Sequence, residues 1–387
     1  MGHPALILRP YGLFVSGELR LGLEIVREEG RIVSVRPHTG IPEDYLLSVP
    51  FVNAHSHLEY RGFQGRLDGL PYWDWIRELT RRKSEQSLDD VRADCHLAAQ
   101  ENRATGVALV GEHSDRPFSG EAMASEGLDG ILFQEVITFF EQESREEKLS
   151  QVAANLEQNQ KSFSGTAVLN PHALYTVDER TLREFGGSKD PISLHLAESV
   201  HESEFYEYRK GPIAEFYARF DVDPGGMKGS PVAVAHDLGL LRPGAQIVHA
   251  CDLDDSDLNL LASSGASVVH CPRSNRALGC PDAPVFEMLR LGVDVGLGLD
   301  SAASSGPIDM FAEMQGALAA SIRRGRPISG EDVWNMATTM GARTLGRSGW
   351  DLEPGFSGPL IRLQLAAIQD AESAILAGSP GTIEWVP

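Results

Sequence analysis

The sequence predicts an α/β protein: a (β/α)8 (TIM) barrel with a small β-sandwich domain built from the two ends of the chain. With 387 residues, the chain is long enough for one large barrel and a minor domain. From about Gly106 onward, short apolar runs alternate with longer helical patterns, as in βα units around a parallel sheet. Both ends instead carry short strand-like pieces. We therefore expect the small domain to comprise residues 1–48 and 348–387, and the barrel residues 49–347.

The elements follow in barrel order along the chain. The expected barrel strands are Val49–Ala54, Val107–Val110, Ile131–Ile137, Thr166–Asn170, Ile192–Leu196, Gln246–Ala250, Ser267–Cys271 and Val293–Leu299. The expected helices are Leu88–Arg103, Gln142–Asn159, Asp178–Phe185, Glu202–Phe220, Asp255–Ser264, Pro284–Leu291 and Ile308–Arg323. The small domain is expected to contain strands at Leu6–Leu8, Gly12–Val15, Leu23–Arg27, Arg31–Arg36, Leu360–Leu365 and Thr382–Val386. The count of eight strands matches a closed barrel.

Composition narrows the class of partner. A net charge of −21 opposes binding to nucleic acid, and no apolar run is long enough to span a bilayer. The four cysteines form no CxxC pair, so we expect free thiols in a reducing, cytoplasmic setting. The expected partner is a small-molecule substrate, with no nucleic acid and no membrane, and a homodimer is left open.

The run His55-Ser56-His57 is the strongest local indication of a metal site. Side chains two apart in a strand point to one face, so both imidazoles would face the same way and suit a divalent ion such as zinc. By itself the pattern is weak, because His-X-His also occurs by chance on strands without a metal.

Further histidines fall at the carboxyl ends of the expected strands. They are His172, His195, His249 and His270, and the eighth strand ends at Asp300. Barrel active sites form at this face, because the loops there converge on the axis. His270 can instead satisfy a backbone carbonyl, which we favour over metal binding, and His113 is equally ambiguous.

Six runs in chain order carry a specific resemblance. They are Asn53-Ala54-His55-Ser56-His57-Leu58-Glu59, Pro171-His172-Ala173-Leu174-Tyr175, His195-Leu196-Ala197-Glu198, Val248-His249-Ala250, His270-Cys271-Pro272-Arg273-Ser274-Asn275 and Gly298-Leu299-Asp300-Ser301. In these runs the chain resembles the amidohydrolase superfamily, in its cytosine and adenosine-type deaminase branch. It looks most like aminodeoxyfutalosine deaminases and related chlorohydrolase-like proteins. The resemblance covers essentially the whole chain.

The resemblance implies a mononuclear metal-dependent deaminase. It assigns one divalent ion to His55, His57, His195 and Asp300, with zinc expected first and iron or manganese as alternatives. Water activated at the metal would attack a ring carbon. Glu198 would shuttle protons, while His249 and Asp300 position and activate the water. Binuclear relatives carry a bridging lysine at the end of the fourth strand, where this chain has Asn170-Pro171-His172, so a single metal is expected.

The expected substrate is an adenine-type nucleoside such as aminodeoxyfutalosine. Leu58-Glu59 and the later run from Gly69 to Ile76 carry this part of the resemblance, and the expected substrate contacts are His172, Glu59 and Arg273. The aromatic stretch Tyr72–Trp75 can stack on a purine, although aromatics at this spacing more often form the core of a helix. The run Pro354–Ile361 departs from the family's usual pattern.

Three alternatives stay open. The first is a triazine-type hydrolase that removes chloride or an alkylamine. The second is a deaminase of guanine, cytosine or pterins. The third is a metal-binding barrel without enzymatic activity, which leaves the combination of Glu198 and His249 unexplained.

Overall fold

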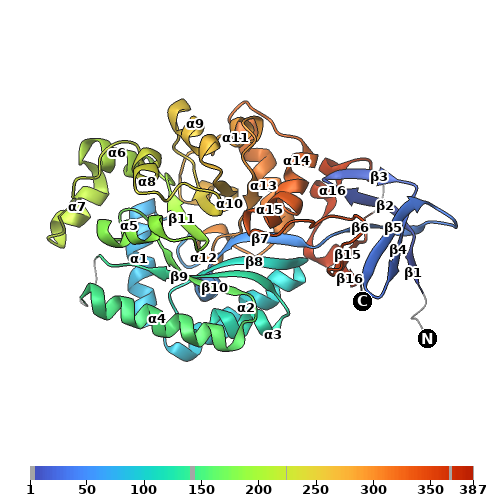
Figure 1. The fold of residues 1–387 in the computed structure, drawn as a ribbon, viewed down its shortest axis with the longest axis horizontal. Coiled ribbons are helices and arrows are strands. Elements are labelled where there is room, and N and C mark those ends of the chain that lie inside the picture. Colours follow the sequence, from blue (N-terminus) through green and yellow to red (C-terminus); the bar gives the residue numbers. More distant parts are fainter. Residues whose placement is uncertain (1–4, 140–143, 224, 366–367, 387) are drawn as a thin grey trace.

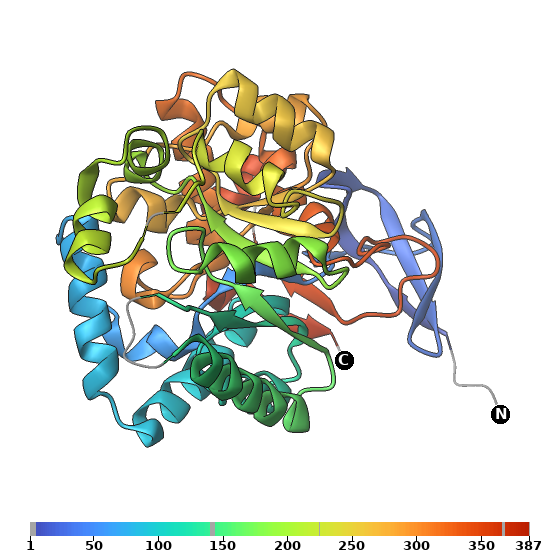
Figure 2. The same ribbon diagram turned by 60° about the vertical axis from the view of Figure 1, so that its left-hand side comes forward.

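Eight parallel strands form the centre of the molecule, as the computed structural model shows for residues 5–139, 144–223, 225–365 and 368–386. Figure 2 shows helices packed around the outside of these strands. The strands are β7 (Phe51–Ser56), β8 (Val107–Ser114), β9 (Asp129–Val136), β10 (Thr166–Pro171), β11 (Ile192–Leu196), β12 (Ala245–His249), β13 (Ser267–His270) and β14 (Val295–Leu297). They pair in two runs of four, from β7 to β10 and from β11 to β14. Each of the eight expected barrel strands therefore has a counterpart.

Two parallel bridges join the runs and close the barrel. One links Ala173, just after β10, to His195 in β11, and the other links Ser56 at the end of β7 to Asp300, just after β14. At the second joint the Asp300 N–H donates to the His55 carbonyl at 2.9 Å, and the His57 N–H donates to the Asp300 carbonyl at 3.2 Å. Both joints lie at the carboxyl ends of strands, so barrel closure itself brings the candidate site residues together.

The remaining elements of residues 49–347 connect the barrel strands or follow the last of them. They are η1 (Leu58–Phe63), α1 (Tyr72–Glu85), α2 (Leu88–Ala104), α3 (Ser119–Ser125), α4 (Arg145–Ser162), α5 (Glu179–Gly187), α6 (Val200–Tyr208), α7 (Gly211–Arg219), α8 (Pro231–Asp237), α9 (Asp255–Ser264), α10 (Pro272–Ala277), α11 (Val285–Arg290), α12 (Ala302–Ser305), α13 (Met310–Arg323), α14 (Gly330–Met336) and α15 (Thr339–Thr344). Several begin at a side-chain cap, such as the capping box of Ser144 and Glu147 at α4.

One expected helix is wrong as a single element. The stretch Glu202–Phe220 is split into α6 and α7. Arg209 takes a left-handed conformation with φ of 56°, and Gly211 and Pro212 follow it. Proline has no N–H to continue a helix and restricts the residue before it, so α6 ends here and a new helix begins. The expected start of the helix at Gln142 lies outside the described residues.

The two ends of the chain form two further sheets. One contains β1 (Leu6–Leu8), β4 (Leu23–Glu28) and β5 (Arg31–Pro37). The other has the order β16 (Ile383–Val386), β15 (Leu360–Leu363), β6 (Glu43–Ser48), β2 (Pro10–Val15) and β3 (Glu18–Leu21), with α16 (Ala371–Ala377) and η2 (Pro380–Thr382) between β15 and β16. Figure 1 shows these blue and red strands side by side at one end of the molecule.

Side chains from both terminal sheets share a buried apolar cluster. It is formed by Leu8, Leu13, Val15, Ile25, Ile32, Tyr45, Leu47, Val49, Leu352, Phe356, Leu360 and Val386. Asp351 ties the two ends together, because its carboxylate accepts hydrogen bonds from the backbone N–H of Ser16 at 3.0 Å. The atypical run near Pro354 therefore lies in a segment that packs onto the N-terminal strands.

The structure bears on two expectations drawn from the composition, one about the cysteines and one about long apolar helices. The four cysteines are free thiols. Among the described helices, none combines the length and apolarity that a bilayer crossing requires.

Candidate active site

The four predicted metal ligands converge at the carboxyl end of the barrel. Asp300 Oδ1 lies 3.7 Å from His55 Nε2 and 3.9 Å from His57 Nε2. The ring centres of His55 and His195 are 4.8 Å apart. By distance alone His249 also fits, since one donor atom from each of His55, His195 and His249 can be chosen with all three within 4.8 Å of one another. His55, His57, His195 and His249 thus form a cluster of imidazoles, called the imidazole nest below, with the Asp300 carboxylate at its edge.

The donor set fits a divalent ion because each side chain keeps an atom available. His55 Nε2 is buried without a hydrogen-bond partner among the described residues, while His55 Nδ1 pairs with His113 Nδ1 at 3.0 Å. His195 Nδ1 donates to the His172 carbonyl at 2.9 Å, which leaves its Nε2 available. Outer partners of this kind fix the ring orientation of metal-binding histidines. Three imidazoles and a carboxylate are ligands that zinc accepts.

One oxygen of Asp300 is held while the other faces the histidines. Ser274 Oγ and Ser304 Oγ donate to Oδ2, and Oδ1 points toward His55 and His57. The carboxylate therefore presents a defined oxygen to an ion.

The candidate ligands are also in the right protonation state. Burial, reinforced by neighbouring histidines, lowers the pKa of His55, His57 and His195 well below the usual value. All three are neutral at pH 7, and a metal ligand must be neutral imidazole.

Glu198 reaches the site through a bend in the chain directly after β11. Ala197 adopts a left-handed conformation with φ of 51°, which turns the backbone out of the strand as the HxxE spacing requires. Glu198 Oε1 then lies 3.7 Å from His249 Nε2, and Tyr72 donates to Oε2 at 2.6 Å. Burial raises the pKa of the Glu198 carboxyl, and His249 and Tyr72 oppose that rise. A raised carboxyl pKa suits a group that takes up and releases a proton near neutrality.

Glu202 binds the backbone of this bend through its side chain. Its carboxylate accepts the N–H of Ala197 at 3.0 Å and the N–H of Glu198 at 2.8 Å, and the side chain is buried. These two contacts satisfy the backbone donors of Ala197 and Glu198 at this turn. Glu202 is thus expected to fix the backbone from which the Glu198 side chain projects.

Replacing Glu202 with alanine is expected to lower the free energy of unfolding by about 2–3 kcal/mol, because two buried N–H groups lose their acceptors. Chemical denaturation measures this change. Glu204→Ala is the matched control, since Glu204 is exposed on the same helix and its carboxylate pairs with His201. Equal stability of the two variants would contradict this role of Glu202.

His249 is oriented by an amide. Its Nδ1–H donates to Asn275 Oδ1 at 2.8 Å, so Nε2 is directed to Glu198. His249 has φ of 74° and Asp300 has φ of 53°, both in the left-handed region. Non-glycine residues in this region carry local strain and concentrate at functional sites.

Asn275→Ala is expected to lower kcat about tenfold with the metal content unchanged, because His249 loses the partner that sets its tautomer and ring angle. Steady-state kinetics with metal analysis measures both quantities. Asn259, exposed on α9, provides the control Asn259→Ala. A fall in metal content would show that Asn275 acts on the ion instead.

The three expected substrate contacts differ in how far protein partners already engage them. Glu59 is buried, accepting from Ser114 Oγ at 2.8 Å and from the Asp115 N–H at 3.3 Å, and burial raises its pKa to about 8. Arg273 lies near Glu313 and donates to the Pro307 carbonyl at 2.9 Å. His172 stacks on His195 with ring centres 4.6 Å apart. His172 is thus in ring contact with a predicted metal ligand, and direct contact of any of the three with substrate stays a prediction.

Several contacts at the site were not predicted from the sequence. Tyr72 contacts Glu198, and His113 contacts His55. Glu135 at the end of β9 is buried, and its Oε1 lies 3.8 Å from His195 Nδ1 with no hydrogen-bond partner in the part of the chain that the structure describes. His270 satisfies no backbone carbonyl, contrary to our expectation, since neither ring nitrogen has a partner in the described chain. The sequence analysis left His113 ambiguous at its strand end, a strand-end position would also have indicated Glu135, and nothing local indicated the contact of the Tyr72 hydroxyl.

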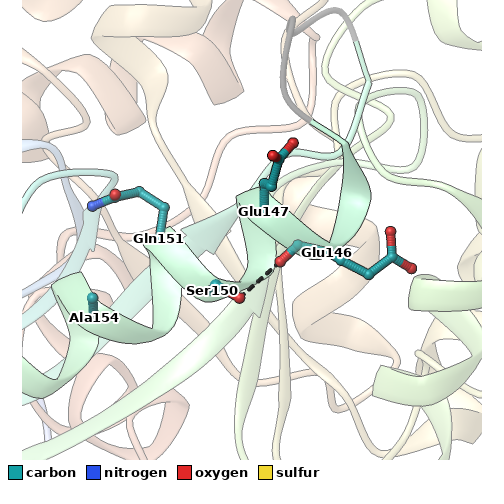
Figure 3. Close-up of a pocket in the computed structure, with 5 residues that line it drawn as sticks. All are labelled: Glu146, Glu147, Ser150, Gln151 and Ala154. Carbon is teal, nitrogen blue, oxygen red and sulfur yellow. Dashed lines mark hydrogen bonds between the residues drawn. The ribbon is translucent and has the colours of Figure 1, made fainter.

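A separate shallow hollow lies on the surface of α4. Figure 3 shows its five lining residues on one helix, with Ser150 Oγ donating to the Glu146 carbonyl at 2.9 Å. It contains none of the predicted site residues, and its serine is used within the helix. The hollow therefore offers none of the metal-ligating or acid–base groups that gather at the barrel rim.

The Amidohydrolase family matches residues 49–375, which is most of the chain. The chain belongs to this family. It is therefore a hydrolase that acts on carbon–nitrogen bonds. A 5-methylthioadenosine/S-adenosylhomocysteine deaminase of Haloarcula marismortui is 32% identical over 371 residues, covering 90% of this chain and 81% of that protein.

Solved structures of the same fold include two deaminases. An adenosine deaminase from Xanthomonas campestris with bound zinc has a TM-score of 0.82 at 22% identity, covering 97% of this amidohydrolase and 90% of that chain. A Helicobacter pylori aminofutalosine deaminase in complex with methylthio-coformycin has a TM-score of 0.78 at 19% identity, covering 98% and 99%. At these identities the likeness shows the fold alone.

Proposed function

We propose that this amidohydrolase is a mononuclear metal-dependent deaminase that releases ammonia from an adenine-type nucleoside. The observation that carries the proposal is the pairing of Glu198 with His249 beside the imidazole nest. A metal-binding site alone has no need for a buried carboxyl that reaches toward it through a strained bend. A hydrolytic deaminase needs a proton carrier at that place.

The reaction replaces a ring amine by oxygen. The water oxygen bonds to the ring carbon, the carbon–nitrogen bond breaks, and the two water protons end on the ring nitrogen and on the departing ammonia. His55, His57, His195 and Asp300 would hold a divalent ion, which when bound lowers the pKa of water toward neutrality. Zinc is the first candidate, and iron or manganese are accepted by the same ligands.

The chain's own residues move the protons. Glu198 Oε1 accepts a proton from the attacking water and delivers it to the ring nitrogen, and a second transfer protonates the amine as it leaves. His249 Nε2, fixed by Asn275, lies 3.7 Å from the same carboxyl oxygen and orients the water. Asp300 Oδ1 is the acceptor on the opposite side, because Ser274 holds its other oxygen.

Two lines of argument point to different substrates of one chemical class, the adenine nucleosides. Aminodeoxyfutalosine follows from the Leu58-Glu59 resemblance. Methylthioadenosine or S-adenosylhomocysteine is favoured by the curated relative, which matches this chain at 32% identity over 90% of its length. Both present an adenine ring to the same site, so the proposal rests on adenine and leaves the sugar substituent to experiment.

An ammonia-release screen tests the proposal. The purified metal-loaded protein is incubated with adenosine, methylthioadenosine, S-adenosylhomocysteine, aminodeoxyfutalosine, guanine, cytosine, a pterin and a chlorotriazine. We expect ammonia from at least one adenine nucleoside at a rate above the others. Release confined to guanine, cytosine or pterin, or chloride release from the triazine, would replace this substrate class, and no turnover of any compound would overturn the enzymatic assignment of the site.

The same proposal includes the domain division and the setting of the protein. The division at residues 48/49 and 347/348 assigns the terminal sheets to a small β-sandwich domain and catalysis to the barrel. A small-molecule substrate and a cytoplasmic setting accord with the acidic charge and the free thiols.

A further inference from the structure

Tyr72 makes a buried hydrogen bond to the proposed proton carrier. Its hydroxyl lies 2.6 Å from Glu198 Oε2, although the two residues are 126 positions apart. Tyr72 is the first residue of α1, and Pro71 precedes it. The contact therefore brings a helix that follows β7 onto a loop that follows β11.

The start of α1 is anchored on more than one side. Trp75 Nε1 donates to the Ala303 carbonyl at 3.3 Å, in the helix that follows Asp300. Trp73 packs edge-on against Tyr175, with ring centres 6.1 Å apart. Tyr72 and Trp73 are buried. These contacts hold the phenol at one place relative to Glu198.

The two carboxylate oxygens of Glu198 are consequently not equivalent. Oε2 is occupied by the Tyr72 hydroxyl, whereas Oε1 faces His249 Nε2. Burial and the Glu198 charge raise the pKa of Tyr72 well above its usual value, so the phenol keeps its proton and acts as a donor at every working pH. A donor fixed on one oxygen leaves the other as the basic position.

We propose that Tyr72 is a positioning residue that locks the Glu198 carboxylate by donating to Oε2, so that Oε1 is the oxygen that takes up and releases the transferred proton. This inference rests on the proposed deaminase function. In chemical terms the phenol proton stays on Tyr72, and the protons that move are those of water: Oε1 takes up the first and delivers it to the ring nitrogen, and the second ends on the departing ammonia. Loss of the phenol would free the carboxylate to rotate and would remove a donor that stabilises its charged form.

The test is a double-mutant comparison. Tyr72→Phe in the otherwise native chain is expected to lower kcat about tenfold to a hundredfold, because a hydrogen bond to a charged group is lost, with KM changed less than about threefold. In a Glu198→Gln background the same substitution is expected to change kcat less than about twofold, since Tyr72 acts through Glu198. If Glu198→Gln shows no measurable turnover, the comparison is made in Glu198→Asp, whose shorter side chain withdraws from the phenol.

Tyr206→Phe is the matched control. Tyr206 is buried on α6, and its hydroxyl has no hydrogen-bond partner in the described chain. The control removes the same atom without touching Glu198, so its kcat is expected to stay within about twofold of the native value. Metal content and melting temperature of each variant confirm that the fold is retained.

The outcomes separate the two proposals. No ammonia from any nucleoside with the native protein overturns the proposed function. Native turnover with an unchanged kcat in Tyr72→Phe, a loss confined to KM, or equal losses in both backgrounds overturns the role of Tyr72 alone. Phe retains the whole apolar ring, so a Tyr72→Phe protein that fails to fold would show that the hydroxyl is needed for folding. That outcome counts against a specific role of the hydroxyl in positioning Glu198.

Discussion

Glu198→Gln is expected to lower kcat about 10²- to 10⁴-fold while leaving the metal in place. Glutamine keeps the shape of the side chain and an oxygen that accepts from Tyr72, but it cannot carry a proton. Glu198 is not among the predicted ligands, which are His55, His57, His195 and Asp300. The substitution thus isolates proton transfer from metal binding.

Ammonia release under saturating substrate and metal content by mass spectrometry measure the two effects separately. Glu204→Gln makes the same chemical change at an exposed position of α6 and is expected to behave as the native protein. Turnover retained in Glu198→Gln would mean that a different group shuttles the proton. Loss of the metal would instead make Glu198 part of the ligand set.

His55→Ala is expected to reduce the bound metal from about one ion per chain to near zero and to lower turnover at least about a thousandfold. His55 lies in the middle of the nest. Its ring is in contact with those of His57, His195 and His249, and its Nε2 faces Asp300 Oδ1. The substitution removes a central donor and leaves only three of the four predicted ligands, His57, His195 and Asp300.

Metal content after dialysis against a weak chelator provides the measurement. Chelation of the native protein with a strong chelator is expected to abolish ammonia release, and zinc is expected to restore it. His236→Ala, at an exposed position on α8, controls for the loss of an imidazole as such. Unchanged occupancy in His55→Ala would remove His55 from the ligand set, and full activity of the metal-free protein would refute the mechanism.

Local pattern was sufficient to predict the barrel, because each βα unit is coded within a short stretch. The strands at Ile192–Leu196 and Thr166–Asn170 match observed elements to within one residue. The helix expected from Glu202 to Phe220 failed because apolar spacing continues across Gly211 and Pro212, while the backbone there cannot. Short rim helices such as α10 and α12 were missed, since four to six residues carry little periodicity.

For the candidate site, too, local features could be predicted and long-range contacts could not. Histidines at strand ends can be found from the sequence because the barrel brings every strand end to one face. The contacts that orient them cannot, since they join distant segments: Tyr72 to Glu198, and His55 to His113. Nothing local to Tyr72 distinguishes an aromatic residue that packs in a helix from one whose hydroxyl also contacts a distant segment of the same rim.

Three of the four predicted metal ligands lie at the joint between β7 and β14, the first and last strands of the barrel. Asn53 Oδ1 accepts the Leu299 N–H at 2.8 Å across 246 positions of sequence, and the His57 and Asp300 amides bond across the same line. His55, His57 and Asp300 lie on both sides of this seam, so an ion held by them would connect the first strand of the barrel to the last. Metal binding and barrel closure would then be thermodynamically linked, and amide hydrogen exchange at His57 and Asp300, compared with and without added zinc, is expected to report this coupling.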